Sequence, residues 1–213
     1  VCTTDKGVNQ GDLKKPLPFD LSITKGKLEN GLAYYIKENQ MPSHEVVIWL
    51  IVKAGSLLEQ EQEKGAAHFI EHMAFNGSNR FKKEEMVDFF HSIGMGTSSD
   101  VNAITGFYET IYKISLNTDS PKTLQKGFEV LKDFINGITF DPQEIEKVRK
   151  IIIEEWRRGQ GVVGRKSSKY FSILTDYSKH STRMPIGSTE VIKTIKPTEL
   201  KRFYSNWYQP KRM

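Results

Sequence analysis

The chain is organised around residues 66–75, which read AAHFIEHMAF. In a helix, side chains three and four positions apart share a face, so His68, Glu71 and His72 would point the same way. Two neutral imidazoles on one face make half of a tetrahedral zinc site. A carboxylate beside them that is not itself a ligand can take a proton from a zinc-activated water. The stretch therefore predicts a metal site with its own general base.

The apolar surroundings of this H-x-x-E-H spacing favour the metal interpretation. The spacing alone arises by chance in many helices, where it means two ordinary histidines and a surface glutamate. Here the flanking residues are apolar, so the helix should be mostly buried and its polar groups need partners. Two of the five histidines of the chain fall in this motif. Its order is the reverse of H-E-x-x-H and is the signature called inverzincin.

A third metal ligand is expected from another helix, because no further histidine lies at a suitable helical spacing. Asp141-Pro142 is a helix start signal, and the helix should run to about Arg158. Its apolar stripe consists of Ile145, Val148, Ile152 and Trp156. Glu155 lies along that stripe, whereas Glu154 is turned away by about 100°. A carboxylate on an apolar stripe must be paired or bound to metal. Glu155 is the predicted ligand, and the alternative is a helix-surface glutamate.

The remaining sequence predicts strands that come in hairpins and helices that come in runs. Strands are expected at residues 23–28, 32–37, 45–53, 97–105 and 109–116, with Asn30-Gly31 at the first hairpin turn. Residues 45–53 read EVVIWLIVK, which suits a central strand covered on at least one face. Helices are expected at residues 60–73, 82–93, 121–136, 141–158, 166–177, 189–194 and 197–207. This order predicts an α+β fold, an antiparallel or mixed sheet with helices packed mainly on one face.

Composition limits the class of protein. Residues 1–20 are polar and interrupted by prolines, so we expect an extended arm followed by one domain over residues 21–213. The net charge is +5, but basic residues are interleaved with acidic ones, which argues against nucleic-acid binding. The longest apolar run, Val46 to Val52, is seven residues long, so no membrane span is expected. The single cysteine, Cys2, excludes an internal disulfide; it is a candidate for lipid modification, although Val1 fits that motif poorly.

The motif and three later landmarks resemble the N-terminal catalytic domain of the insulinase/pitrilysin family of zinc metallopeptidases, of the bacterial "zinc protease" type. HFIEHMAFNGS at 68–78 resembles the family motif nearly residue for residue. IEEWR at 153–157 resembles the helix whose second glutamate binds zinc, and MPIG at 184–187 and FYSNWYQP at 203–210 resemble later landmarks. The resemblance implies one zinc ion per domain, held by His68, His72 and Glu155, with Glu71 as the catalytic base of an endopeptidase.

The resemblance also implies partners. Residues 102–105 (NAIT) resemble the strand to which a peptide or unfolded polypeptide adds as a further β-strand, so Asn102 and Ala103 are predicted substrate-binding residues. The alternative is an ordinary interior strand or its loop. A second homologous half, in the same chain or another subunit, would close over the site and supply an Arg and a Tyr. The implied location is the bacterial periplasm or cell envelope, with a lipid anchor as an option.

Three departures from the family pattern keep alternatives open. The interval between His72 and Glu155 is longer than usual, and Val148 stands where many active members have a supporting glutamate. The family's domain continues into another strand beyond the position of Met213, so we expect a truncated domain. The alternatives to an active peptidase are a non-catalytic, peptide-binding partner subunit and an inactive fragment of a larger peptidase. The complete set of motif residues favours the enzyme.

Overall fold

The computed structural model describes residues 19–41, 43–94 and 103–213. The predicted arm therefore lies outside the described residues except for Phe19 and Asp20, and so does Asn102. None of the described helices is long and apolar enough to cross a membrane.

The described strands form two antiparallel sheets. β1 (Ile23–Lys27) pairs with β2 (Ala33–Lys37) across a turn in which Gly31 has a φ of 92°. β3 (Glu45–Val52), β4 (Ala103–Thr105) and β5 (Thr110–Asn117) form a second sheet in the order β3-β5-β4. The expectation that residues 45–53 form a central strand is wrong for the described sheet, because β3 lies at an edge and β5 is central. The apolar composition of residues 45–53 reflects the burial of one face of β3. It does not indicate whether the strand has a neighbour on both of its edges.

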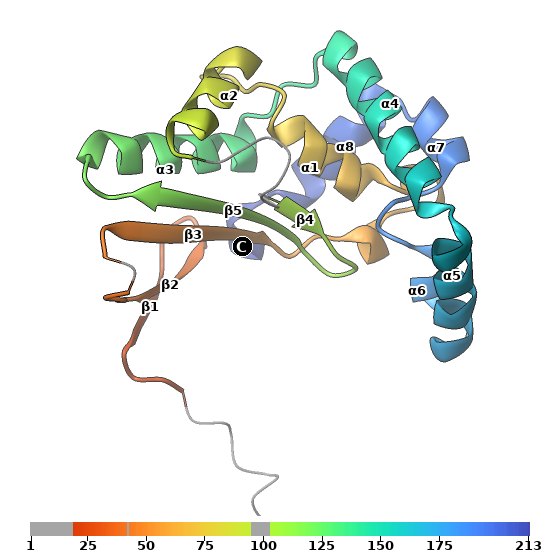
Figure 1. Cartoon of the computed structure of the whole chain (residues 1–213), viewed down its shortest axis with the longest axis horizontal. Helices are drawn as coiled ribbons and strands as arrows, with labels where there is room; N and C mark the ends of the chain where they lie inside the picture. Colours follow the sequence, from red (N-terminus) through yellow and green to blue (C-terminus); the bar gives the residue numbers. More distant parts are fainter. Residues whose placement is uncertain (1–18, 42, 95–102) are drawn as a thin grey trace, which may run out of the picture.

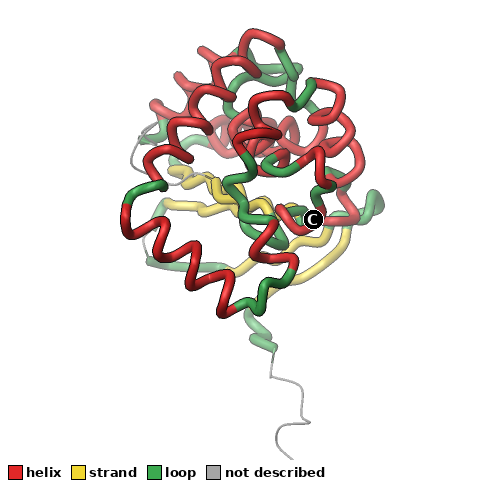
Figure 2. Tube along the Cα trace, turned by 90° about the vertical axis from the view of Figure 1, so that its right-hand side faces the viewer, coloured by secondary structure: helices red, strands yellow, loops and turns green. Residues whose placement is uncertain are grey.

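Eight helices are described, and most of them lie on one side of the strands (Figures 1 and 2). They are α1 (Ala66–Ala74), α2 (Lys83–Ser92), α3 (Pro121–Asn136), α4 (Pro142–Gly159), α5 (Val162–Leu174), α6 (Lys179–Thr182), α7 (Thr189–Thr194) and α8 (Pro197–Trp207). Short 3-10 turns occur at Ser56–Leu58, Glu61–Glu63 and Pro210–Arg212. The predicted α+β class, with helices mainly on one face of an antiparallel sheet, is confirmed.

The helix that carries the motif is packed against the sheet at the centre of the molecule (Figure 1). The side chains of β5 alternate, and Thr110, Tyr112, Ile114 and Leu116 are buried beneath the helices. On α1, the buried positions are Ala66, Ala67, Phe69, Ile70, Met73 and Ala74. Because α1 contacts α4, α8 and the sheet, only a narrow strip of it is left for polar side chains.

The start of α1 differs from the prediction. A helix was expected from Gln60, but α1 begins at Ala66, after a 3-10 turn at Glu61–Glu63. Gly65 has a φ of 102°, in the left-handed region that favours glycine, and it separates the two segments. Glycine at this position allows the sharp turn that aims α1 into the core.

A groove of about 770 Å³ separates β2 from β3. It is lined by residues 35–39 on one side and 45–48 on the other. At one end, backbone carbonyls of the last two residues bridge the two sheets. Arg212 O accepts from Lys53 N at 2.8 Å, just beyond β3, and Met213 O accepts from Ala33 N at 3.4 Å, on β2.

Candidate metal and catalytic site

Three predicted ligand side chains meet where α1 faces α4. His68 Nε2 and His72 Nε2 are 3.1 Å apart, and Glu155 Oε2 lies 3.5 Å from each of them. Ile145, Val148 and Ile152, on the stripe of α4, are buried and press this helix against its neighbours. Glu154 is exposed and pairs with Arg157 at 2.6 Å. The structure thus brings Glu155, and not Glu154, to the two histidines.

The spacing of these atoms fits a tetrahedral metal ion. Donor atoms about 2.0–2.2 Å from zinc, at tetrahedral angles, lie roughly 3.3–3.6 Å apart. The three measured separations, 3.1, 3.5 and 3.5 Å, fall in or near that range. Two imidazole nitrogens and one carboxylate oxygen are also a donor set that zinc accepts, with a fourth position left over.

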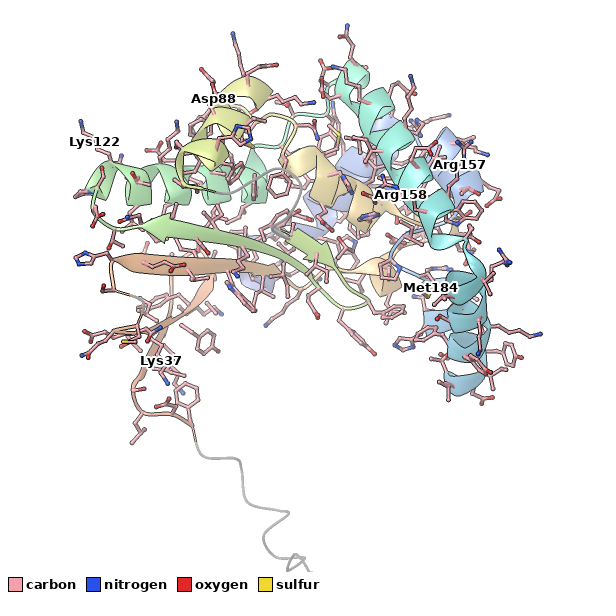
Figure 3. The ribbon with its side chains drawn as sticks, viewed as in Figure 1. Lys37, Asp88, Lys122, Arg157, Arg158 and Met184 are labelled. Carbon is pink, nitrogen blue, oxygen red and sulfur yellow. The ribbon has the colours of Figure 1, made fainter. Side chains whose placement is uncertain are left out.

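The electrostatics of the cluster favour the ligand forms of the side chains. Burial, reinforced by the neighbouring His72, lowers the pKa of His68 to about 4, so its imidazole is neutral at physiological pH. The hydrogen bond with His72 lowers the pKa of Glu155 below its usual value, and the charge of Arg158 acts in the same direction. Arg158 projects from the same stretch of α4 (Figure 3). The cluster therefore offers a neutral imidazole at His68 and a carboxylate anion at Glu155, beside the imidazole of His72.

Glu71 lies beside this cluster but does not belong to it. The group of side chains that could share one ion consists of His68, His72 and Glu155. Burial raises the pKa of Glu71 above its usual value. Its Oε2 accepts a hydrogen bond of 2.5 Å from Thr105 Oγ1, on β4. A partly buried carboxylate next to a metal-type cluster is placed as a general base would be.

A cavity of about 250 Å³ opens onto these groups. Its lining residues are His68, Glu71, Ala103, Ile104, Thr105, Glu155, Pro185 and Ile186. Ala103, predicted to bind substrate, therefore lies at the site, on a strand whose outer edge is free among the described strands. Asn102, its predicted partner, lies outside the described residues. Ile104 also belongs to the predicted substrate strand, whereas Pro185-Ile186 belongs to a segment that the sequence marked only as a family landmark.

The structure adds a support for α1 that the sequence did not suggest. Glu59 is 2% exposed, and its carboxylate accepts from the backbone nitrogens of Gly65 and Ala67, both at 2.9 Å. It therefore caps the helix on which His68 stands. Arg183 packs against the same turn and donates to Glu59 O at 3.3 Å. Glu59 precedes α1 by too many residues to match a capping signal, so local spacing could not reveal it.

Comparisons with known proteins agree with this geometry. Residues 34–161 match the family described as Insulinase (Peptidase family M16). The chain is 38% identical over 197 residues to a Haemophilus influenzae protein described as probable zinc protease PqqL, and 37% identical to the Escherichia coli protein of the same description. Each alignment covers 92% of this chain and 21% of the relative. The chain thus spans about a fifth of the length of these curated relatives.

A solved structure shows the same likeness. The first half of the periplasmic protease PqqL from Escherichia coli matches with a TM-score of 0.88 and 37% identity. The match covers 92% of this chain and 42% of that one.

Proposed function

Since this chain belongs to the insulinase family of peptidases, peptidase family M16, we propose that it carries the metal-binding and proton-transfer groups of a zinc-dependent endopeptidase. The observation that supports this most strongly is the arrangement of four side chains. His68, His72 and Glu155 form one ligand-type cluster, and Glu71 lies beside it as a separate, partly buried carboxylate.

In the proposed mechanism, each of these side chains has one role. His68, His72 and Glu155 hold the metal ion. When bound, zinc would supply Lewis acidity, which makes water more acidic and polarises the scissile carbonyl. Glu71 accepts the proton of the attacking water and then delivers it to the leaving amine. The raised pKa of Glu71 suits a group that must both take and return a proton.

The proposed substrate is an extended peptide or unfolded polypeptide that adds to β4 as a further strand. The edge of β4 that is free among the described strands borders the same cavity as His68 and Glu71, with Ala103 and Ile104 in its wall. Main-chain hydrogen bonds would hold such a peptide largely independently of its sequence. Asn102 belongs to this proposed binding strand.

We further propose that a second homologous half completes the enzyme and that residues 21–213 form the metal-binding domain. The relatives are about five times longer than the matched segment, and one solved relative is described as a first half. That relative is described as a periplasmic protease, and we propose the same compartment here. A lipid anchor at Cys2 remains part of the sequence-based hypothesis.

The test compares zinc content and peptide hydrolysis in the complete protein. Glu71→Gln should retain zinc but lose about 10²- to 10⁴-fold in kcat, because only proton transfer is removed. His68→Ala should lose both zinc and activity. Glu154→Gln is the matched control, since Glu154 is the neighbouring exposed glutamate of α4 and should change neither property. Full activity in Glu71→Gln, or full zinc occupancy in His68→Ala, would refute the assignment.

A further inference from the structure

We propose that Thr105 is a positioning residue that couples the substrate-binding strand to the general base. This inference rests on the proposed function, because it assigns Thr105 to the same site. Thr105 belongs to β4 through its backbone and contacts Glu71 through its side chain. A single residue therefore joins the strand that would hold the peptide to the carboxylate that would move the proton.

The alternation of β4 turns the side chains of Ile104 and Thr105 to opposite faces of the strand. Ile104 is 57% exposed, whereas Thr105 is 9% exposed and turns inward toward α1. Its hydroxyl donates to Glu71 Oε2 at 2.5 Å. Among the described residues, no other side chain makes a hydrogen bond with this carboxylate within normal distance. The orientation of Glu71 thus depends on Thr105, chiefly on its hydroxyl and to a smaller extent on its backbone N–H.

The hydrogen bond leaves the carboxylate usable as a base. A carboxylate has two oxygens and about four lone-pair positions, so one donor does not saturate it. With Oε2 engaged by Thr105, Oε1 is left to meet a water in the cavity that both residues line. Loss of the hydroxyl would let the carboxylate rotate, and misorientation of a catalytic group by even a fraction of an ångström slows proton transfer.

Among the described strands, the backbone of Thr105 is fixed from one side only. It pairs with Thr110 of β5, and Thr110 is itself anchored by its hydroxyl to Ala54 O at 2.9 Å. The other edge of β4 is free among the described strands. A peptide that paired with this edge would hold β4 between two neighbours and so fix the position of the Thr105 hydroxyl. Binding of an extended substrate would then also align the base.

The experiment separates positioning from simple support of the fold. In the complete, zinc-loaded protein, Thr105→Val keeps the shape of the side chain and removes the hydroxyl, whereas Thr105→Ser keeps the hydroxyl. We expect Thr105→Val to retain zinc, to change KM by less than about 3-fold and to lower kcat about 10- to 100-fold, as for loss of a hydrogen bond to a charged group. Thr105→Ser should restore kcat to within about 3-fold of the wild type.

Thr139→Val is the matched control, because the Thr139 hydroxyl is partly buried and donates to Gly77 O at 3.0 Å, within another loop. It should leave kcat unchanged. If Thr105→Val does not fold, Thr105→Ala removes the same hydroxyl without the branched side chain and is compared with Thr105→Ser. Melting temperature and zinc content are measured for every variant.

The outcomes distinguish this inference from the function on which it rests. Three results would overturn the positioning role while Glu71→Gln stays inactive. They are a wild-type kcat in Thr105→Val, a fall in kcat that is equally large in Thr105→Ser, and an effect of Thr105→Val on KM alone. Activity in Glu71→Gln would instead overturn the proposed function. In the Glu71→Gln background, Thr105→Val should cause no further loss, because the two residues act as one unit.

Discussion

Glu59 shows how a single buried carboxylate can support a site that it does not touch. Burial raises its pKa to about 8, against the opposing effect of two backbone N–H donors and the nearby Arg183. Its ordinary value is 4.5, so the folded protein binds this proton more tightly than the unfolded chain does. The stabilisation linked to this proton is therefore complete below about pH 4.5 and is lost as the pH rises through about 8.

A glutamine at this position should remove that pH dependence. The free energy of unfolding of the wild type, relative to Glu59→Gln, should fall by about 1–3 kcal/mol between pH 5 and pH 9. Urea unfolding at several pH values measures the difference, and titrations common to both proteins cancel. Glu61→Gln is the control: neighbouring cations lower the pKa of Glu61 to about 2, so its effect should be constant over this range. A constant difference for Glu59→Gln would contradict the burial argument.

Site residues that are close in sequence could be predicted more readily than residues that meet only after folding. His68, Glu71 and His72 lie within one helical turn of one another, so local spacing was sufficient to group them. Glu155 could be selected over Glu154 because a carboxylate on an apolar stripe needs a partner. Thr105 and Glu59 make contacts that depend on how segments distant in sequence pack together. A periodic pattern of apolar and polar residues does not predict such contacts.

The segment at Met184–Gly187 and the beginning of α1 constrain each other as backbone elements. Gly187 has a φ of 80°, and a Cβ placed on it would lie 2.5 Å from Gly65 Cα and 2.8 Å from Lys64 O. Met184 marks this segment beside α5 and α6 (Figure 3). Since the atoms that a Cβ would meet are backbone, a larger residue could be accommodated only if the segment or α1 moved.

Gly187→Ala should therefore destabilise the protein by more than about 2 kcal/mol, from both the left-handed backbone and the clash. It should also raise KM, because Pro185 and Ile186 line the cavity. Chemical denaturation and peptide kinetics measure the two effects. Gly159→Ala, at a position where a Cβ meets nothing within 4 Å, should shift stability by less than about 0.5 kcal/mol. Wild-type stability in Gly187→Ala would show that the contact is not tight.

Prediction of elements succeeded where local signals are strong and failed where packing decides. Proline and cap signals identified α7, α8 and the start of α4, where Asp141 Oδ1 accepts from Gln143 N at 2.8 Å. The start of α1 was placed too early, because Gly65 and a distant carboxylate set it. The helix after α4 was expected from residue 166, but α5 begins at Val162.

At the level of the domain, the ligand cluster joins α1 to α4, which are far apart in sequence. An ion that binds only the folded form stabilises it by mass action, by about 2.7 kcal/mol at 100 times the dissociation constant. Zinc added to the metal-free protein should therefore raise the melting temperature by roughly 5–10 °C. Differential scanning calorimetry measures the shift, and His68→Ala should abolish it.

His91→Ala is the matched control for this prediction, because His91 is exposed on α2, away from the cluster. It should respond to zinc as the wild type does. An undiminished shift in His68→Ala would mean that the ion binds elsewhere.

The groove between β2 and β3 bears on how the chain behaves at high concentration. Unpaired strand edges invite edge-to-edge association, and open-ended growth requires an edge that a second sheet can approach. Here residues 35–39 of one sheet and 45–48 of the other line the groove, and the backbone carbonyls of Arg212 and Met213 bond to Lys53 and Ala33 respectively. We expect a single extended segment to pair with these two edges more readily than a second sheet does.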